Sequence, residues 1–214
     1  MRTPHGLMHG SDEWAGRFGD DYTSRQSLTI AARAAMFQKI LRRSPQPHSI
    51  IEFGANTGDN LQALRQLLPS AHLAGVEINE QAFRKMKLIA NIAFHGSMLD
   101  FPSAGRWDMA LTRGLLIHIH PVELVRAYDV LYRAASRWIC IAEYYNPTPV
   151  MIPYRGENDR LWKRDFAGEM LERYRDLRLI DYGFIYHRDP FAPQDDVTWF
   201  LMEKTLPNPD AGIR

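Results

Sequence analysis

The sequence predicts an α/β fold built on a mostly parallel sheet of seven strands, with helices on both faces and an antiparallel hairpin at its C-terminal end. Three observations predict it. Short apolar runs that fit buried strands alternate with helix-forming runs between residues 49 and 142. The first strand leads through a glycine turn directly into a helix. The last two β-forming runs are joined by a loop without a helix, which favours an antiparallel pair.

The glycine turn follows the first predicted strand. Ile50 and Ile51 form its apolar run, Glu52 stands at its end, and the turn from Gly54 to Gly58 precedes a helix. Strand, glycine turn and helix form the opening unit of a Rossmann-like nucleotide site. A glycine turn can also simply join a strand to a helix, so this segment alone leaves both interpretations open.

The spacing of the glycines argues for one kind of ligand. A dinucleotide fingerprint needs glycine where Asn56 stands, and no Lys-Ser or Lys-Thr follows as in a P-loop. Glu52 would repel a phosphate but suits an ammonium group. S-adenosylmethionine carries an ammonium and a carboxylate and no phosphate. We therefore expect Glu52 to bind its ammonium, and Gly54, Asn56 and Gly58 to belong to the turn that binds its carboxylate.

A second acid supports this interpretation. Glu77 ends the next predicted strand, where a doubly wound fold places the carboxylate that binds a ribose. A carboxylate there accepts hydrogen bonds from two ribose hydroxyls and repels the 2′-phosphate of NADP. Ile78 follows it at the same edge and is placed with the cofactor-binding residues. An acid that favours a helix start is the structural alternative for Glu77.

The remaining elements follow from apolar periodicity, caps and breakers. Asn79 and Asp165 are suitable helix caps, and Pro121 suits a first helical turn. We expect helices at 13–23, 27–43, 61–68, 80–90, 122–135 and 165–174, and strands at 71–77, 92–95, 107–112, 137–142, 177–186 and 197–203.

The chain is expected to form one domain, residues 1–214, with a Rossmann-like core at 46–204. Residues 1–45 precede the core and form either a helical lid over the cofactor or a cap on the sheet edge. Tyr22 and Arg25 lie in this region, and we expect them to close the lid or to bind the methionine carboxylate of the cofactor.

Two further strand ends supply candidate cofactor contacts, because strand ends line the ligand crevice of such a sheet. Ser97 and Met98 follow the third strand and are expected to contact the adenine. Ordinary core packing is an equal alternative for Met98. Arg113 ends the fourth strand and is placed with the cofactor-binding residues.

Two histidines and an acid follow strand ends near the crevice. His118, His120 and Glu143 suggest a metal, but no further ligands appear at suitable spacing, and we expect no metal site. His118 and Glu143 are instead candidates for a general base.

The segment from Glu143 to Arg155 combines three prolines with several polar and aromatic side chains. Prolines stiffen a loop, and stiff polar loops above a crevice suit substrate recognition. A surface connector is the alternative. The candidate acceptor-binding residues are Tyr144, Tyr145, Asn146, Tyr154, Arg155 and His187.

Composition limits the remaining possibilities. The chain has 214 residues and a net charge of +1, so no basic excess points to a nucleic acid. Cys140 lies in an apolar run and is expected in the core. No signal peptide or membrane span is visible, and we expect a cytoplasmic monomer or homodimer.

Several motifs resemble those of class I S-adenosylmethionine-dependent methyltransferases, and more narrowly the bacterial methylases associated with pseudaminic acid biosynthesis. They are Gly19–Arg25, Ile78–Glu80, Leu116–Pro121, Ala142–Pro149, Ile152–Gly156, Lys163–Glu169 and Tyr182–Pro190. The resemblance implies N- or O-methylation of a small polar acceptor such as an amino sugar. The alternatives are a methyltransferase for an unrelated amine or carboxylate, a non-catalytic cofactor-binding subunit, and an NAD-linked sugar oxidoreductase, which Asn56 and the antiparallel end disfavour.

Overall fold

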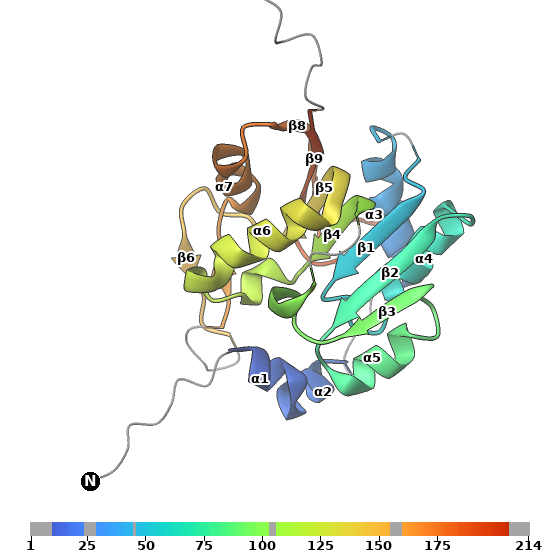
Figure 1. Cartoon of the computed structure of the whole chain (residues 1–214), viewed down its shortest axis with the longest axis vertical. Coiled ribbons are helices and arrows are strands. Elements are labelled where there is room, and N and C mark those ends of the chain that lie inside the picture. Colours follow the sequence, from blue (N-terminus) through green and yellow to red (C-terminus); the bar gives the residue numbers. More distant parts are fainter. Residues whose placement is uncertain (1–9, 24–28, 45, 103–105, 155–159, 206–214) are drawn as a thin grey trace, which may run out of the picture.

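The computed structural model describes residues 10–23, 29–44, 46–102, 106–154 and 160–205. Its main sheet is built from β1 (Ser49–Phe53), β2 (His72–Glu77), β3 (Ile92–His95), β4 (Trp107–Arg113), β5 (Ala135–Glu143), β8 (Leu177–Ile185) and β9 (Val197–Lys204). These seven strands lie in the order β3-β2-β1-β4-β5-β9-β8 (Figure 1). β1 to β5 are parallel, and β9 is antiparallel to both of its neighbours. The predicted mostly parallel sheet with an antiparallel C-terminal pair is confirmed.

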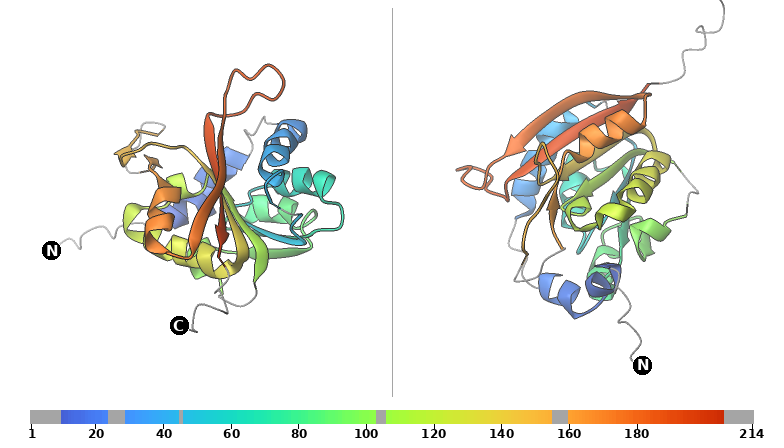
Figure 2. Two further views of the ribbon diagram at one scale, coloured as in Figure 1. Left: turned by 90° about the horizontal axis from the view of Figure 1, so that it is seen from above. Right: turned by 90° about the vertical axis from the view of Figure 1, so that its left-hand side faces the viewer.

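Helices cover both faces of the sheet (Figure 2). One face carries α3 (Ile30–Leu41), α4 (Asp59–Leu67) and α5 (Glu80–Met86), and the other carries α6 (Leu124–Ala134) and α7 (Phe166–Arg173). Successive strand residues point to opposite faces. Ile50 therefore packs under the first group of helices and Ile51 under the second. The sheet therefore has a hydrophobic core on each face. Because both faces are buried, consecutive residues of the buried strands are apolar.

The predicted caps are confirmed where a side chain can accept a backbone N–H. The Asn79 Oδ1 accepts from Ala82 N at 3.0 Å, and the Asp165 Oδ1 accepts from Gly168 N at 2.8 Å. Pro121 begins a short 3-10 turn, η3 (Pro121–Glu123), so α6 starts after it. The single helix predicted at 13–23 is instead α1 (Gly10–Ala15) and α2 (Arg17–Thr23), because the chain turns at Gly16.

The segment after β5 is more regular than expected. Within the predicted loop, β6 (Val150–Met151) pairs with β7 (Trp162–Lys163) in a separate two-stranded sheet. The segment thus folds back on itself beside the end of the main sheet. Cys140 is buried in the core, as predicted.

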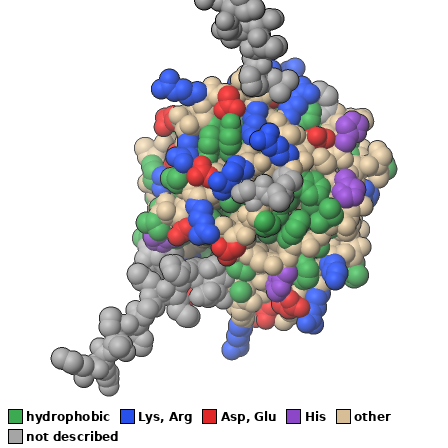
Figure 3. Space-filling view, viewed as in Figure 1, with side chains coloured by type: hydrophobic (Ala, Val, Ile, Leu, Met, Phe, Trp, Pro, Cys, Tyr) green, Lys and Arg blue, Asp and Glu red, His purple; other side chains and the backbone are tan. Residues whose placement is uncertain are grey.

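The surface shows mixed charge. On the face that carries α6, Lys and Arg side chains lie among Asp and Glu and do not gather into one basic track (Figure 3). No helix among the described residues is long and apolar enough to cross a membrane.

Candidate functional site

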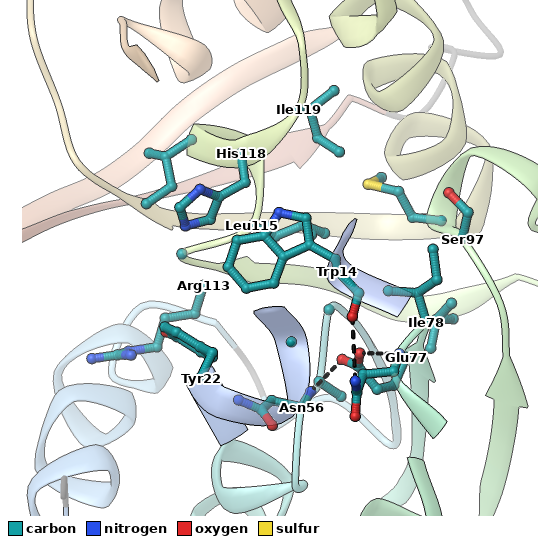
Figure 4. Close-up of a pocket in the computed structure, with 18 of the residues that line it drawn as sticks. Trp14, Tyr22, Asn56, Glu77, Ile78, Ser97, Arg113, Leu115, His118 and Ile119 are labelled. Carbon is teal, nitrogen blue, oxygen red and sulfur yellow. Dashed lines mark hydrogen bonds between the residues drawn. The ribbon is translucent and has the colours of Figure 1, made fainter. Parts of the chain in front are cut away.

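A cavity of about 590 Å³ lies at the carboxyl ends of β1, β2 and β4. The glycine turn, the residues after β2 and β3, and the segment after β4 form its walls, and α1 and α2 add side chains from the N-terminal region (Figure 4). This is where open α/β sheets bind ligands, and the volume suits a small molecule.

The glycine turn has the left-handed backbone that its sequence indicates. Gly54, Asn56 and Gly58 have φ of +69°, +47° and +85°. A Cβ on Gly54 would lie 2.8 Å from Leu115 Cδ1, so glycine is needed there. Gly54 and Asn56 line the cavity. Gly58 does not: it precedes α4 and packs against α5 through Met86.

Glu77 lines the cavity at the end of β2. One oxygen accepts from Asn56 N at 2.8 Å and the other from Asn79 N at 2.7 Å. Burial raises the pKa of this carboxyl, and the backbone hydrogen bonds oppose that rise. Two N–H groups thus orient Glu77 and favour its ionised form.

The candidate cofactor residues that follow β2 and β3 also lie at the cavity. Ile78, Ser97 and Met98 line it. Ser97 caps the 3-10 turn η1 (Met98–Asp100) through its Oγ, which accepts from Leu99 N at 3.2 Å. Met98 belongs to the buried core as well, so the two interpretations of this residue are not exclusive.

Glu52 is placed differently from the sequence-based expectation. It is fully buried and does not line the cavity, because its side chain turns into the protein behind the turn. Its Oε1 accepts from Asn60 Nδ2 at 2.6 Å, and burial raises its pKa to about 8. Asn60 does line the cavity, and its Oδ1 accepts from Arg33 Nη1 at 2.6 Å.

His118 lines the cavity from η2 (Leu116–His118). Its Nδ1 lies 2.8 Å from the carbonyl oxygen of Arg160, and its ring centre lies 4.5 Å from that of Trp14 and 5.5 Å from that of Tyr154. Burial lowers its pKa to about 4, so the imidazole is neutral at physiological pH. A carbonyl oxygen only accepts, so Nδ1 carries the proton and Nε2 has the free lone pair.

Glu143 lies outside the cavity lining, although it was predicted as a second candidate base. Its carboxylate is buried and accepts from the backbone N–H groups of Leu115, Leu116 and Ile117 at 3.1, 3.2 and 3.4 Å. Burial raises its pKa to about 7. These contacts tie the end of β5 to the segment that carries His118.

The predicted acceptor residues divide into two groups. Tyr144 and Tyr154 line the cavity. Tyr145, Asn146 and His187 do not: Tyr145 packs near Phe200, Asn146 bonds to Thr148, and His187 pairs with Asp196 on the surface. Arg25 and Arg155 lie outside the described residues.

The N-terminal helices contact the walls of the cavity. Trp14, Tyr22 and Thr23 line it, and Thr23 Oγ1 donates to Asn56 Oδ1 at 3.2 Å. Asn79 Nδ2 donates to Asp20 Oδ1 at 2.8 Å, and the Arg160 guanidinium pairs with Glu13 at 2.7 Å. Hydrogen bonds and an ion pair therefore connect α1 and α2 to three different segments around the cavity.

Several cavity residues were not predicted from the sequence. Among them are Trp14, Arg33, Asn60, Arg126 and Asp195. Arg33 had one usable signal, a lone arginine among the apolar positions of an alanine-rich helix. No group of three or more His, Cys, Asp or Glu side chains that could hold a metal occurs in the described part of the chain.

Comparison with solved structures identifies the fold. The 1,6-didemethyltoxoflavin N1-methyltransferase of Burkholderia thailandensis, with its substrate and S-adenosylhomocysteine bound, superposes with a TM-score of 0.66 at 15% identity over 96% of this chain and 94% of that one. The magnesium protoporphyrin IX methyltransferase of Synechocystis, with S-adenosylmethionine bound, gives 0.66 at 10% identity over 94% and 100%. This chain has the class I methyltransferase fold.

A third similar structure is that of a methyltransferase that acts on a sugar. The sugar N-methyltransferase KedS8 of a Streptoalloteichus species has a TM-score of 0.64 at 16% identity over 96% of this chain and 99% of that one. No protein-family model and no curated protein matches the sequence.

Proposed function

We propose that the protein is a methyltransferase that uses S-adenosylmethionine to methylate nitrogen or oxygen of a small polar acceptor. The observation that carries this is Glu77, held at the cavity wall by the N–H groups of Asn56 and Asn79. Each of its oxygens has accepted one hydrogen bond and retains capacity for another. The carboxylate is thus oriented to accept from two vicinal ribose hydroxyls.

The rest of the cavity fits the same ligand. Ile78, Met98 and Leu99 offer apolar contacts to an adenine. The N–H groups of Gly54, Ala55, Asn56 and Gly58 already donate to protein oxygens, so the turn offers few donors to a carboxylate. The acids Glu77 and Asp59 line the wall beside that turn and disfavour a phosphate. A nucleoside with an amino-acid tail therefore suits the cavity better than a dinucleotide.

The bound cofactor supplies an electrophilic methyl group on a sulfonium. When the atom to be methylated is a hydroxyl oxygen, Nε2 of His118 serves as the general base. The proton of the acceptor hydroxyl would pass to Nε2 as the bound cofactor methylates its oxygen, and the cofactor sulfur would keep the electron pair of the broken bond. His118 gains the positive charge that the sulfonium loses, so the net charge of the cavity is unchanged. A neutral amine needs no base in this step.

The aromatic residues around His118 would orient the acceptor and exclude water. Trp14 and Tyr154 lie against the imidazole, and Tyr144 lines the same cavity. The Asp195 carboxylate also lines the cavity and offers an acceptor for amino or hydroxyl groups. The sequence resemblance and the sugar N-methyltransferase among the similar structures support an amino sugar as the acceptor.

Mass spectrometry of methyl transfer tests the proposal. Purified protein and S-adenosylmethionine are incubated with free and nucleotide-linked nine-carbon amino sugars, their amino-sugar precursors, and unrelated small amines and carboxylates. We expect one methyl group to be added to a sugar. If that methyl group lies on oxygen, the His118→Ala variant should no longer add it. Methylation of only an unrelated compound would refute the sugar assignment. If S-adenosylhomocysteine does not raise the melting temperature of the protein, the cofactor assignment is refuted.

A further inference from the structure

Arg113 lines the cavity as a cation without an anionic partner. Its Nη2 donates to Gln194 Oε1 at 3.2 Å, and its Nε is buried without a hydrogen-bond partner. Among the described residues this guanidinium forms no ion pair, although Arg33, also in the cavity wall, pairs with Asp59 at 3.5 Å. A guanidinium has five N–H donors: Gln194 accepts from one, the Nε–H is buried, and the others remain for a ligand.

Gln194 fixes this guanidinium from a distant part of the sequence. It lies in the loop between β8 and β9, is only 4% exposed, and donates from Nε2 to the carbonyl oxygen of Ala32 at 2.8 Å. A guanidinium only donates and a carbonyl only accepts, so one orientation of the amide satisfies both. Gln194 therefore links α3, the end of β4 and the β8–β9 loop.

The surroundings favour an anion at this point. Arg33 lies close enough for the charge of Arg113 to lower its pKa, after the larger effect of burial. Asp59 pairs with Arg33 at 3.5 Å, whereas the Arg113 guanidinium has no ion pair among the described residues. A bound carboxylate would neutralise the remaining positive charge and accept from the unused donors.

We propose that Arg113 is the carboxylate-binding group of the cavity and that Gln194 is its positioning residue. This rests on the proposed function and defines its ligand further. The carboxylate belongs either to the amino-acid end of the cofactor or to the acceptor. In the second case the acceptor is an acid, which narrows the substrate class to sugar acids and similar carboxylates.

The first arm of the test uses S-adenosylhomocysteine and 5′-methylthioadenosine, which lacks the amino-acid end. Calorimetric affinities are compared for the wild type, Arg113→Gln and the control Arg84→Gln. Arg84 is exposed on α5 and pairs with Glu80 away from the cavity. If the carboxylate is the cofactor's, Arg113→Gln weakens S-adenosylhomocysteine about 10- to 100-fold and changes 5′-methylthioadenosine less than about 3-fold.

The second arm titrates N-acetylneuraminic acid, a nine-carbon sugar acid, and its methyl ester into protein saturated with S-adenosylhomocysteine. If the carboxylate is the acceptor's, the acid binds the wild type, and Arg113→Gln abolishes that binding without changing the cofactor affinity. The inference is overturned if neither arm responds to Arg113→Gln. A wild type that binds no S-adenosylhomocysteine would instead refute the proposed function, and with it this inference.

Gln194→Leu tests the positioning role in whichever arm responds. We expect a selective loss of the carboxylate ligand, about 3- to 10-fold, because Arg113 keeps its charge but loses its orientation. A purely structural role predicts a lower melting temperature with equal weakening of S-adenosylhomocysteine and 5′-methylthioadenosine. Equal weakening would therefore remove Gln194 from the proposal and leave Arg113 in it.

Discussion

The Nδ1 of His118 donates to the carbonyl oxygen of Arg160 across 2.8 Å. This bond fixes the imidazole tautomer and leaves Nε2 unprotonated. The guanidinium of the same Arg160 pairs with Glu13 of α1. One residue thus connects the candidate base with the N-terminal helices.

Removal of the base is expected to lower the rate of O-methylation. His118→Ala should reduce kcat about 10²- to 10⁴-fold and leave the affinity for S-adenosylhomocysteine within a few-fold, because the proton acceptor is lost and the cofactor wall is not. Steady-state kinetics and calorimetry measure both. His187→Ala is the matched control, since His187 lies outside the cavity and pairs with Asp196. Equal kcat in both variants would exclude His118 as the base.

The pH profile should distinguish oxygen from nitrogen acceptors. Burial lowers the pKa of His118 to about 4, so the base is neutral above that pH. For a hydroxyl acceptor we expect kcat/KM to be flat from about pH 6 to 8 rather than to rise near 6.5. For an amine acceptor it should rise to the pKa of the amine, because only the neutral amine reacts. A rise centred near 6.5 that His118→Ala abolishes would contradict the lowered pKa.

Glu143 is expected to act through the backbone that it holds. In Glu143→Gln, an NH₂ group faces a backbone N–H that donates to the carboxylate in the wild type. Because two donors then oppose each other, the unfolding free energy should fall by about 1–3 kcal/mol. Chemical denaturation measures this cost. We expect kcat to fall by a smaller factor than in His118→Ala. Unchanged stability with a 10³-fold loss of kcat would instead identify Glu143 as the base.

Glu52 should make the protein less stable as pH rises. Burial raises its pKa to about 8 from the ordinary 4.5, so the native state holds a proton that the unfolded chain releases. Between these values its contribution falls by about 1.4 kcal/mol per pH unit. Glu52→Gln removes this titration, so the variant should gain stability relative to the wild type from pH 5 to 8. A constant difference in denaturation free energy across that range would exclude the raised pKa.

The pair between Glu13 and Arg160 should affect ligand release more than global stability. Both side chains are partly exposed, at 27% and 22%, so the pair contributes only about 1 kcal/mol after screening. If α1 and α2 form a lid, Glu13→Gln should speed S-adenosylhomocysteine dissociation several-fold in stopped-flow measurements with little change in melting temperature. An unchanged dissociation rate would favour a fixed cap on the sheet edge.

The sheet could be predicted because short stretches of the sequence are enough to mark each of its strands and helices. Apolar runs, glycines, caps and prolines mark each element, and the strand ends then meet at one edge by the rules of parallel sheets. That placed Glu77, Ser97, Arg113 and His118 at the cavity. Period-two alternation also separates Tyr144, which lines the cavity, from Tyr145, which does not.

The remaining site depends on contacts between distant segments. Glu143 follows a strand end like Glu77, but N–H groups 26 to 28 residues away occupy its oxygens. Gln194 stands in a polar turn and meets Ala32 across 162 residues. No local pattern marks such pairings, so the sequence identifies the residues at the strand ends but not which of them face the ligand.

The position of β9 has a consequence for biosynthesis. It is the last strand among the described residues but lies inside the sheet, between β5 and β8. On the ribosome, the nascent chain can assemble its first five strands early, yet the sheet closes only when this strand has emerged and entered from the side. Gln194 lies three residues before β9, so Arg113 acquires its partner in the same event. Because Asp195 and Val197 also line the cavity, the closing of the sheet and the completion of the ligand cavity would coincide.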